Sequence, residues 1–131
     1  MDCVVGTDPY EKFMDTTLCV LIVDDEDAIR TFVRNALSNY EIQEARNGEE
    51  ALTVIQAAKP DLVITDIRMP QMDGFELADR IKEGFPDIPV IALSGYVTRE
   101  EAENHDFADF IDKPARLEDF CSAVERALSK A

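Results

Sequence analysis

Residues 18–25 read Leu18-Cys19-Val20-Leu21-Ile22-Val23-Asp24-Asp25, six apolar side chains followed by two carboxylates. A second run has the same character, because residues 61–66 read Asp61-Leu62-Val63-Ile64-Thr65-Asp66. Continuous apolar runs of this length are typical of strands buried on both faces of a parallel sheet. If these two strands are neighbours, three acids converge at one sheet edge, where a cation would relieve their mutual repulsion.

The chain alternates short apolar runs with amphipathic stretches, which predicts a parallel sheet covered by helices on both faces. Right-handed crossovers favour a flavodoxin-like, doubly wound α/β fold with strand order 2-1-3-4-5, in which the first and third strands are adjacent. The more polar second strand is expected at an edge. The five predicted strands are about Leu18–Asp24, Tyr40–Ala45, Leu62–Asp66, Ile88–Ser94 and Ala108–Asp112.

Five helices are expected between and after these strands. A fourth, short helix is predicted between Ser94 and Ala108, where Thr98 and Glu101 form a capping box but almost no apolar stripe follows. His105 is expected to be exposed there. The other four carry apolar stripes that predict buried faces: Ile29, Phe32, Val33, Ala36 and Leu37; Ala51, Leu52, Ile55 and Ala58; Phe75, Ala78, Ile81 and Phe85; and Leu117, Phe120, Cys121, Val124 and Leu128.

Length and charge bound the class of protein. The 131 residues fit one domain, here residues 17–131, after a leader (1–16) for which the sequence predicts no particular structure. The net charge of −15 disfavours binding to nucleic-acid phosphates and to anionic lipids. No membrane span or signal peptide is evident. The three cysteines are widely spaced and lack a CxxC pair, so we expect no zinc site, no disulfide framework and a reducing cytoplasmic location.

Five polar side chains are predicted at the carboxyl ends of the strands: Asp24, Asp25, Asp66, Ser94 and Lys113. Oxygen ligands of this kind suit Mg²⁺, and two carboxylates about 4 Å apart repel by roughly 4 kcal/mol at an effective dielectric near 20. With the cation bound, Asp66 is the best candidate nucleophile toward a phosphoryl group. Taken singly, the acids also suit a helix cap, Ser94 a turn and Lys113 a surface position.

In four places the chain resembles the receiver domain of two-component response regulators, over essentially all of Leu18 to Lys130. The matching blocks are Val23-Asp24-Asp25-Glu26, Thr65-Asp66-Ile67-Arg68-Met69-Pro70-Gln71-Met72-Asp73-Gly74, Ser94-Gly95 and Asp112-Lys113-Pro114. They occur in the order of the family and at near-family spacing. The resemblance implies Mg²⁺-dependent transfer of a phosphoryl group from a sensor histidine kinase or phosphotransfer protein, and no turnover of a separate substrate.

The resemblance also implies roles for single residues. Asp66 is expected to be the phospho-acceptor, Asp25 a direct Mg²⁺ ligand, and Asp24 a ligand through water or an acidic support. The backbone carbonyl of Arg68 is expected to complete the metal ligands, and Lys113 to pair with the phosphoryl charge.

Activation is expected to work through a switch pair. Ser94 is expected to hydrogen-bond the phosphoryl oxygen, and Phe110 to move inward as the surface of the last strands and helices changes. The resemblance implies a downstream protein or output domain as partner, a possible homodimer on activation, and a cis Lys113–Pro114 bond.

The chain departs from the family pattern in several places. Ser94 and Lys113 are 19 positions apart, about three fewer than expected, so the fourth helix is expected to be shorter. Because that helix forms part of the usual output surface of the family, the resemblance leaves the mode of partner binding or dimerisation undecided. Asp106-Phe107 replaces a frequent Gly-Ala pair, and Ala115 replaces a frequent aromatic. Arg68 and Tyr96 flank the predicted phosphoryl position, and we hypothesise that they shield the acyl phosphate from water.

Three alternative functions compete with this interpretation. A haloacid-dehalogenase-like phosphohydrolase needs an acid two residues after its nucleophile, where this chain has Arg68. A flavodoxin-like cofactor binder would meet repulsion between its phosphate and Asp24-Asp25-Glu26. A phosphorylation-independent pseudo-receiver stays open. The 18 residues after Lys113 suit one helix, so the chain is either a single-domain regulator or the receiver of a larger protein.

Overall fold

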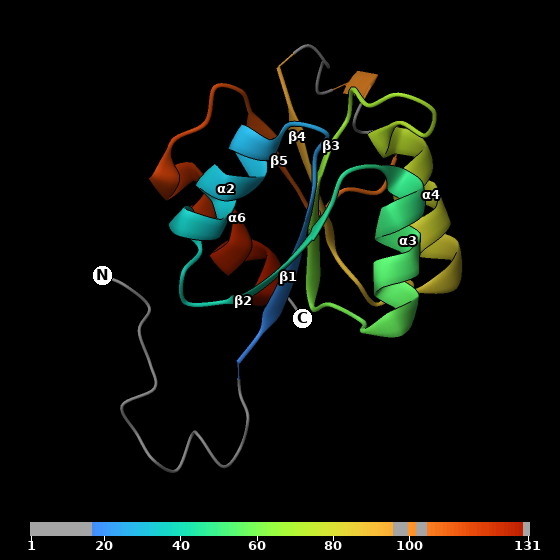
Figure 1. Cartoon of the computed structure of the whole chain (residues 1–131), viewed down its shortest axis with the longest axis horizontal. Helices are drawn as coiled ribbons and strands as arrows, with labels where there is room; N and C mark the ends of the chain where they lie inside the picture. Colours follow the sequence, from blue (N-terminus) through green and yellow to red (C-terminus); the bar gives the residue numbers. More distant parts are fainter. Residues whose placement is uncertain (1–16, 96–99, 102–104, 130–131) are drawn as a thin grey trace.

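The computed structural model describes residues 17–95, 100–101 and 105–129. Five parallel strands form one sheet in the order β2-β1-β3-β4-β5, as predicted. The strands are β1 (Cys19–Val23), β2 (Glu41–Ala45), β3 (Leu62–Asp66), β4 (Val90–Ser94) and β5 (Asp109–Asp112). The helices are α2 (Asp27–Ala36), α3 (Gly48–Ala57), α4 (Gly74–Gly84) and α6 (Leu117–Ser129). Figure 1 shows α2 and α6 on one face of the sheet and α3 and α4 on the other.

The strands bury both faces because their side chains alternate between two helical layers. Val20 and Ile22 of β1 pack toward the α2 and α6 layer, around Phe120. Leu21 and Val23 pack toward the α3 and α4 layer. This double burial explains the continuous apolar runs, and it fixes the carboxyl ends of β1 and β3 side by side, since Val23 pairs with Thr65.

The predicted strands end within one residue of the observed ends, but most of them begin one or two residues too early. The largest difference is in β4, which starts at Val90 and not at Ile88. Pro89 precedes the strand and has no N–H to donate to a ladder, so regular pairing begins after it.

Three residues predicted to lie on buried helix faces are exposed: Phe32, Ala58 and Leu117. Phe32 is 38% exposed, and Leu117 is 51% exposed. Phe32 contacts the core residue Phe120 in an edge-to-face arrangement of the two rings, at a centroid distance of 5.8 Å. Leu117 is the first residue of α6. The Phe32 and Leu117 side chains therefore extend the apolar surface of the α2 and α6 layer.

Four helices are observed in the described residues, against five expected. The predicted fourth helix between Ser94 and Ala108 falls mostly on residues 96–99 and 102–104, which lie outside the described residues, as does the leader 1–16. Within the part of the chain that the structure describes, no helix is long and apolar enough to cross a bilayer.

Candidate metal and phosphoryl site

The three predicted acids meet at the carboxyl ends of β1 and β3. One carboxylate oxygen from each of Asp24, Asp25 and Asp66 lies within 4.8 Å of the others. Asp24 and Asp66 are buried, whereas Asp25 is exposed. Glu26 occupies the N-cap position of α2 and makes no side-chain cap hydrogen bond, so neither Asp24 nor Asp25 is the N-cap residue of this helix. Asp24 instead accepts the Glu26 N–H on Oδ1 at 2.9 Å.

Lys113 joins this cluster from the loop after β5. Its Nζ lies 3.4 Å from Asp24 Oδ2 and 3.4 Å from Asp66 Oδ1. Its backbone N–H donates to the Ser94 carbonyl at 3.0 Å, and the Lys113–Pro114 bond is cis, as expected. One ammonium among three carboxylates leaves an excess of negative charge, which favours a further cation.

The electrostatics of the cluster follow from its burial. Burial raises the pKa of Asp24 to about 6, and the neighbouring Asp66 adds to the rise, against the Glu26 N–H and Lys113. Burial also raises the pKa of Asp66, although Lys113 and the Arg68 N–H stabilise its anion. Burial would lower the pKa of Lys113, but the Asp24 and Asp66 carboxylates outweigh it and the pKa is raised. The site therefore holds its anions at a cost that a bound cation would offset.

The predicted switch residues lie on the two strands beyond the acids. Ser94 ends β4 and is buried, one position past Leu93, the partner of Asp66 in the sheet. Phe110 is half-buried in β5 and packs with Ile67 and Ala92. Arg68 is exposed and its N–H donates to the Asp66 carboxylate. Tyr96, the other residue of the predicted shielding pair, lies outside the described residues.

Two residues that support the site were missed from the sequence. Gly74 approaches the backbone of Asp66 so closely that a Cβ there would lie 2.4 Å from the Asp66 carbonyl oxygen. The only sequence signal for it is the Pro- and Gly-containing loop that follows Asp66. Arg30 is buried on α2 and bonds to the backbone of Asp24. A single arginine in an amphipathic helix gives no such signal, since it is usually solvated.

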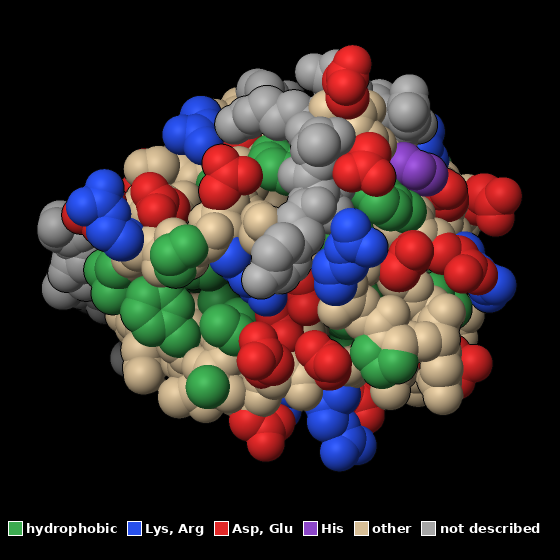
Figure 2. All heavy atoms as spheres, turned by 90° about the horizontal axis from the view of Figure 1, so that it is seen from above, with side chains coloured by type: hydrophobic (Ala, Val, Ile, Leu, Met, Phe, Trp, Pro, Cys, Tyr) green, Lys and Arg blue, Asp and Glu red, His purple; other side chains and the backbone are tan. Residues whose placement is uncertain are grey.

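An open groove of about 680 Å³ adjoins Lys113 on the α2 and α6 side. It is mostly apolar, and it is lined by Glu26, Ile29, Phe32, Leu93, Gly95, Lys113, Pro114, Ala115 and Phe120. Figure 2 shows the corresponding arrangement on the surface, with a hydrophobic patch to the left of a group of acidic side chains. The exposed Phe32 thus borders a surface that continues into the acidic site.

His105 is half-buried, which corrects the expectation that it is exposed. Its ring stacks on Phe75 at a centroid distance of 4.5 Å, and its Nδ1 lies 3.0 Å from Asp79 Oδ1. The stacking on α4 covers one face of the ring. Neither contact reaches the acidic cluster.

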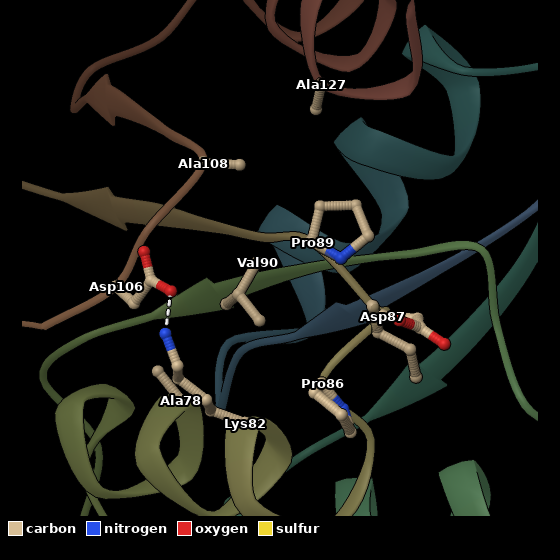
Figure 3. Close-up of a pocket in the computed structure, with 10 residues that line it drawn as sticks. Ala78, Lys82, Pro86, Asp87, Pro89, Val90, Asp106, Ala108 and Ala127 are labelled. Carbon is tan, nitrogen blue, oxygen red and sulfur yellow. Dashed lines mark hydrogen bonds and ion pairs between the residues drawn. The ribbon is translucent and has the colours of Figure 1, made fainter. Parts of the chain in front are cut away.

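A second hollow of about 230 Å³ lies at the amino ends of β4 and β5, away from the acids. Figure 3 shows its wall of Pro89, Val90 and Ala108, with the Lys82–Asp106 ion pair across one side. The hollow carries less charge than the acidic cluster, because Lys82 in its lining forms an ion pair with Asp106. It therefore adds nothing to the chemistry at the opposite end of the sheet.

Comparison with known proteins agrees with this geometry. Residues 20–125 match the family described as response regulator receiver domain. The transcriptional regulator NtrC of Rhizobium meliloti is 34% identical over 120 residues, which cover 88% of this chain and 25% of NtrC. The receiver domain of NtrX from Brucella abortus superposes with a TM-score of 0.80 at 35% identity, covering 86% of this chain and 99% of that one. Chemotaxis protein CheY4 of Vibrio cholerae gives 0.80 at 28%, with the same coverage.

The chain therefore belongs to the receiver domain family of two-component response regulators, with the CheY-like flavodoxin fold. It spans half or less of the length of the curated relatives compared with it.

Proposed function

We propose that this domain accepts a phosphoryl group on Asp66 in a Mg²⁺-dependent step and passes the signal to a protein partner. The observation that carries the proposal is the placement of Lys113 Nζ at 3.4 Å from both Asp24 and Asp66, within a cluster that Asp25 completes. Such a site can hold a divalent cation and a phosphoryl group at once. The proposed donor is a phosphohistidine of a sensor kinase or phosphotransfer protein.

The donor set fits Mg²⁺, because carboxylate oxygens are its preferred protein ligands and the cluster has a surplus of negative charge. Asp25 and Asp66 would hold the ion directly, Asp24 would hold it through water or act as an acidic support, and the Arg68 carbonyl would complete the protein ligands. When bound, the ion would neutralise charge on the transferring phosphoryl oxygens.

The chain's own residues perform the transfer as follows. A carboxylate oxygen of Asp66 attacks phosphorus in line; the P–N bond to the donor imidazole breaks, and its electron pair stays on the imidazole nitrogen. Lys113 already pairs with Asp66, so its ammonium lies beside the position of the new phosphoryl oxygens. The Arg68 N–H, which donates to the Asp66 carboxylate, holds the acceptor in place. No separate substrate is turned over.

The proposed output is a shift of Ser94 and Phe110. An aspartyl phosphate brings up to about two negative charges to the edge where Ser94 lies buried, and a hydroxyl is a natural donor to its oxygens. Movement of Ser94 would free space beside Ala92, against which Phe110 packs. The resulting change in the β4 and β5 surface would select a downstream protein, an output domain or a second copy. The cytoplasmic location stays a prediction.

Intact mass spectrometry after incubation with acetyl phosphate tests the proposal. We expect a single phosphoryl adduct that requires Mg²⁺ and is absent from Asp66→Asn. Failure of the folded wild-type domain to take up phosphate with Mg²⁺ present would instead favour a pseudo-receiver that binds partners without phosphorylation.

Arg68→Ala is expected to speed the loss of the phosphoryl group several-fold. The Arg68 side chain is exposed and lies two residues after Asp66 in the chain, and the proposed role is that it screens the acyl phosphate from water. The measurement is the decay of the phosphorylated domain with time in excess Mg²⁺. Arg80→Ala, which removes an exposed arginine paired with Glu76 on α4, is the matched control. Equal decay of the two variants would show that Arg68 does not shield the phosphate.

A further inference from the structure

Arg30 is a cation on the buried side of α2, with only 8% of its surface exposed. Its Nη1 donates to the backbone carbonyl of Asp24 at 2.7 Å, in a buried hydrogen bond. Its Nε donates to Glu44 of β2 at 3.0 Å, and its Nη2 bonds to Asp27. The guanidinium therefore bridges α2, β2 and the end of β1.

The Asp24 carbonyl needs this donor because it lies just past the regular sheet. The β1–β2 ladder ends at Val23 and Ala45, and the Asp24 N–H still donates to the Ala45 carbonyl at 3.1 Å. The carbonyl belongs to the peptide that joins Asp24 to Asp25. Holding that oxygen fixes the plane of the peptide, and with it the positions of the Asp25 N and Cα atoms from which the side chain extends.

Other contacts do not hold Asp25 in the same way. The Asp24 side chain is fixed from both sides, by the Glu26 N–H and by Lys113. Asp25 is exposed, and its carboxylate lies close to those of Asp24 and Asp66 despite their like charge. Among the described contacts, those that restrain Asp25 act through the backbone on either side of it.

We propose that Arg30 is a positioning residue of the metal site, which holds the Asp24–Asp25 peptide so that the Asp25 carboxylate stays aligned with Asp66. The inference rests on the proposed function, because it takes Mg²⁺ as the ligand of these acids. Supporting partners of metal ligands commonly change metal affinity by about 10–100-fold when removed.

The charge of Arg30 makes the inference testable by the direction in which Mg²⁺ affinity changes when the residue is replaced. The Arg30 guanidinium is bonded to the Asp24 backbone, and a cation at that place adds positive potential near the acidic cluster, so loss of its charge alone would leave cation binding unchanged or strengthen it. Loss of positioning would weaken it. The direction of the change therefore separates the two roles.

Arg34 offers a matched control. It lies one turn further along α2 and shares the ion pair with Glu44, but 53% of its side chain is exposed and its described ion pair is with Glu44 and not with Asp24. Arg34→Ala thus removes the same charge from the same helix without touching the Asp24 peptide.

The experiment is an NMR titration of the domain with Mg²⁺. Arg30→Ala is expected to raise the Mg²⁺ dissociation constant about tenfold over the wild type, while Arg34→Ala leaves it unchanged or slightly lower. Equal or tighter Mg²⁺ binding by folded Arg30→Ala would overturn the positioning role. If the wild type itself binds no Mg²⁺, the proposed function fails first, and this inference fails with it.

Folding is checked in the same spectra. If Arg30→Ala does not fold, the pair Arg30→Lys and Arg34→Lys decides, because lysine keeps the charge but not the planar fork that serves Glu44 and the Asp24 carbonyl together. Weaker Mg²⁺ binding by Arg30→Lys alone would support the role, and equal binding by both variants would refute it.

Discussion

Gly74→Ala is expected to lower the free energy of unfolding by about 3 kcal/mol. An added Cβ would lie 2.4 Å from the Asp66 carbonyl oxygen and 2.8 Å from Ile67 Cα. Both neighbours are backbone atoms, so neither can rotate out of the way. The Gly74 N–H also donates to the Ile67 carbonyl at 2.9 Å, which closes the loop after Asp66. The clash would therefore push the acceptor strand and α4 apart.

Chemical denaturation of the metal-free domain measures this effect. Gly84→Ala is the matched control at the other end of α4, where an added Cβ meets nothing within 4 Å. Gly48→Ala is an intermediate case, because its Cβ would meet the flexible Met72 side chain at 2.5 Å. A loss of stability in Gly74→Ala no larger than in Gly84→Ala would contradict the close approach.

Asp24→Asn is expected to stabilise the metal-free domain at neutral pH, by on the order of 2 kcal/mol. Burial raises the pKa of Asp24 from 3.8 to about 6. Between these values the folded domain binds more protons than the unfolded chain, so stability falls as pH rises. The contribution of protonated Asp24 is fully present below about pH 4 and is lost as pH passes through 6. A neutral amide avoids that loss.

Unfolding in a chelator from pH 4 to 8 tests this prediction. The difference in stability between Asp24→Asn and wild type should grow as pH rises to about 6 and then level off. Asp112→Asn serves as the control, because Asp112 is an exposed acid at the end of β5. A difference that is flat with pH would show that Asp24 is ionised without penalty in the folded domain. Mg²⁺ should narrow the difference at neutral pH, since it stabilises the ionised wild type.

The sheet and the acid cluster are predictable because strands buried on both faces appear in the sequence as continuous apolar runs. The run that ends at Asp66 places that acid at a strand end, and parallel neighbours bring Asp24 and Asp25 to the same edge. The four motif blocks also predict Ser94 and Lys113 at this edge of the sheet. The sequence therefore predicts the features that a local pattern of residue types marks, which are the apolar runs and the motif blocks.

The remaining features depend on tertiary contacts that no local pattern encodes. Helical periodicity placed Phe32 and Leu117 in the core, but it does not show where the neighbouring layer ends. Arg30 looks like any solvated charge until the fold brings the Asp24 carbonyl within 2.7 Å. The polar stretch around His105 predicts an exposed side chain, and its stacking partner, Phe75, lies 30 positions away in the sequence, where no local pattern reveals the contact.

The central claim is that Asp66 itself takes the phosphoryl group. After phosphorylation with acetyl phosphate and Mg²⁺, borohydride reduction converts an aspartyl phosphate to homoserine, and peptide mass spectrometry then locates the modified residue. We expect homoserine at position 66 in the Mg²⁺ sample and none in the sample with chelator. Homoserine at Asp24 or Asp25 in place of Asp66, or at no residue while phosphate is retained, would contradict it.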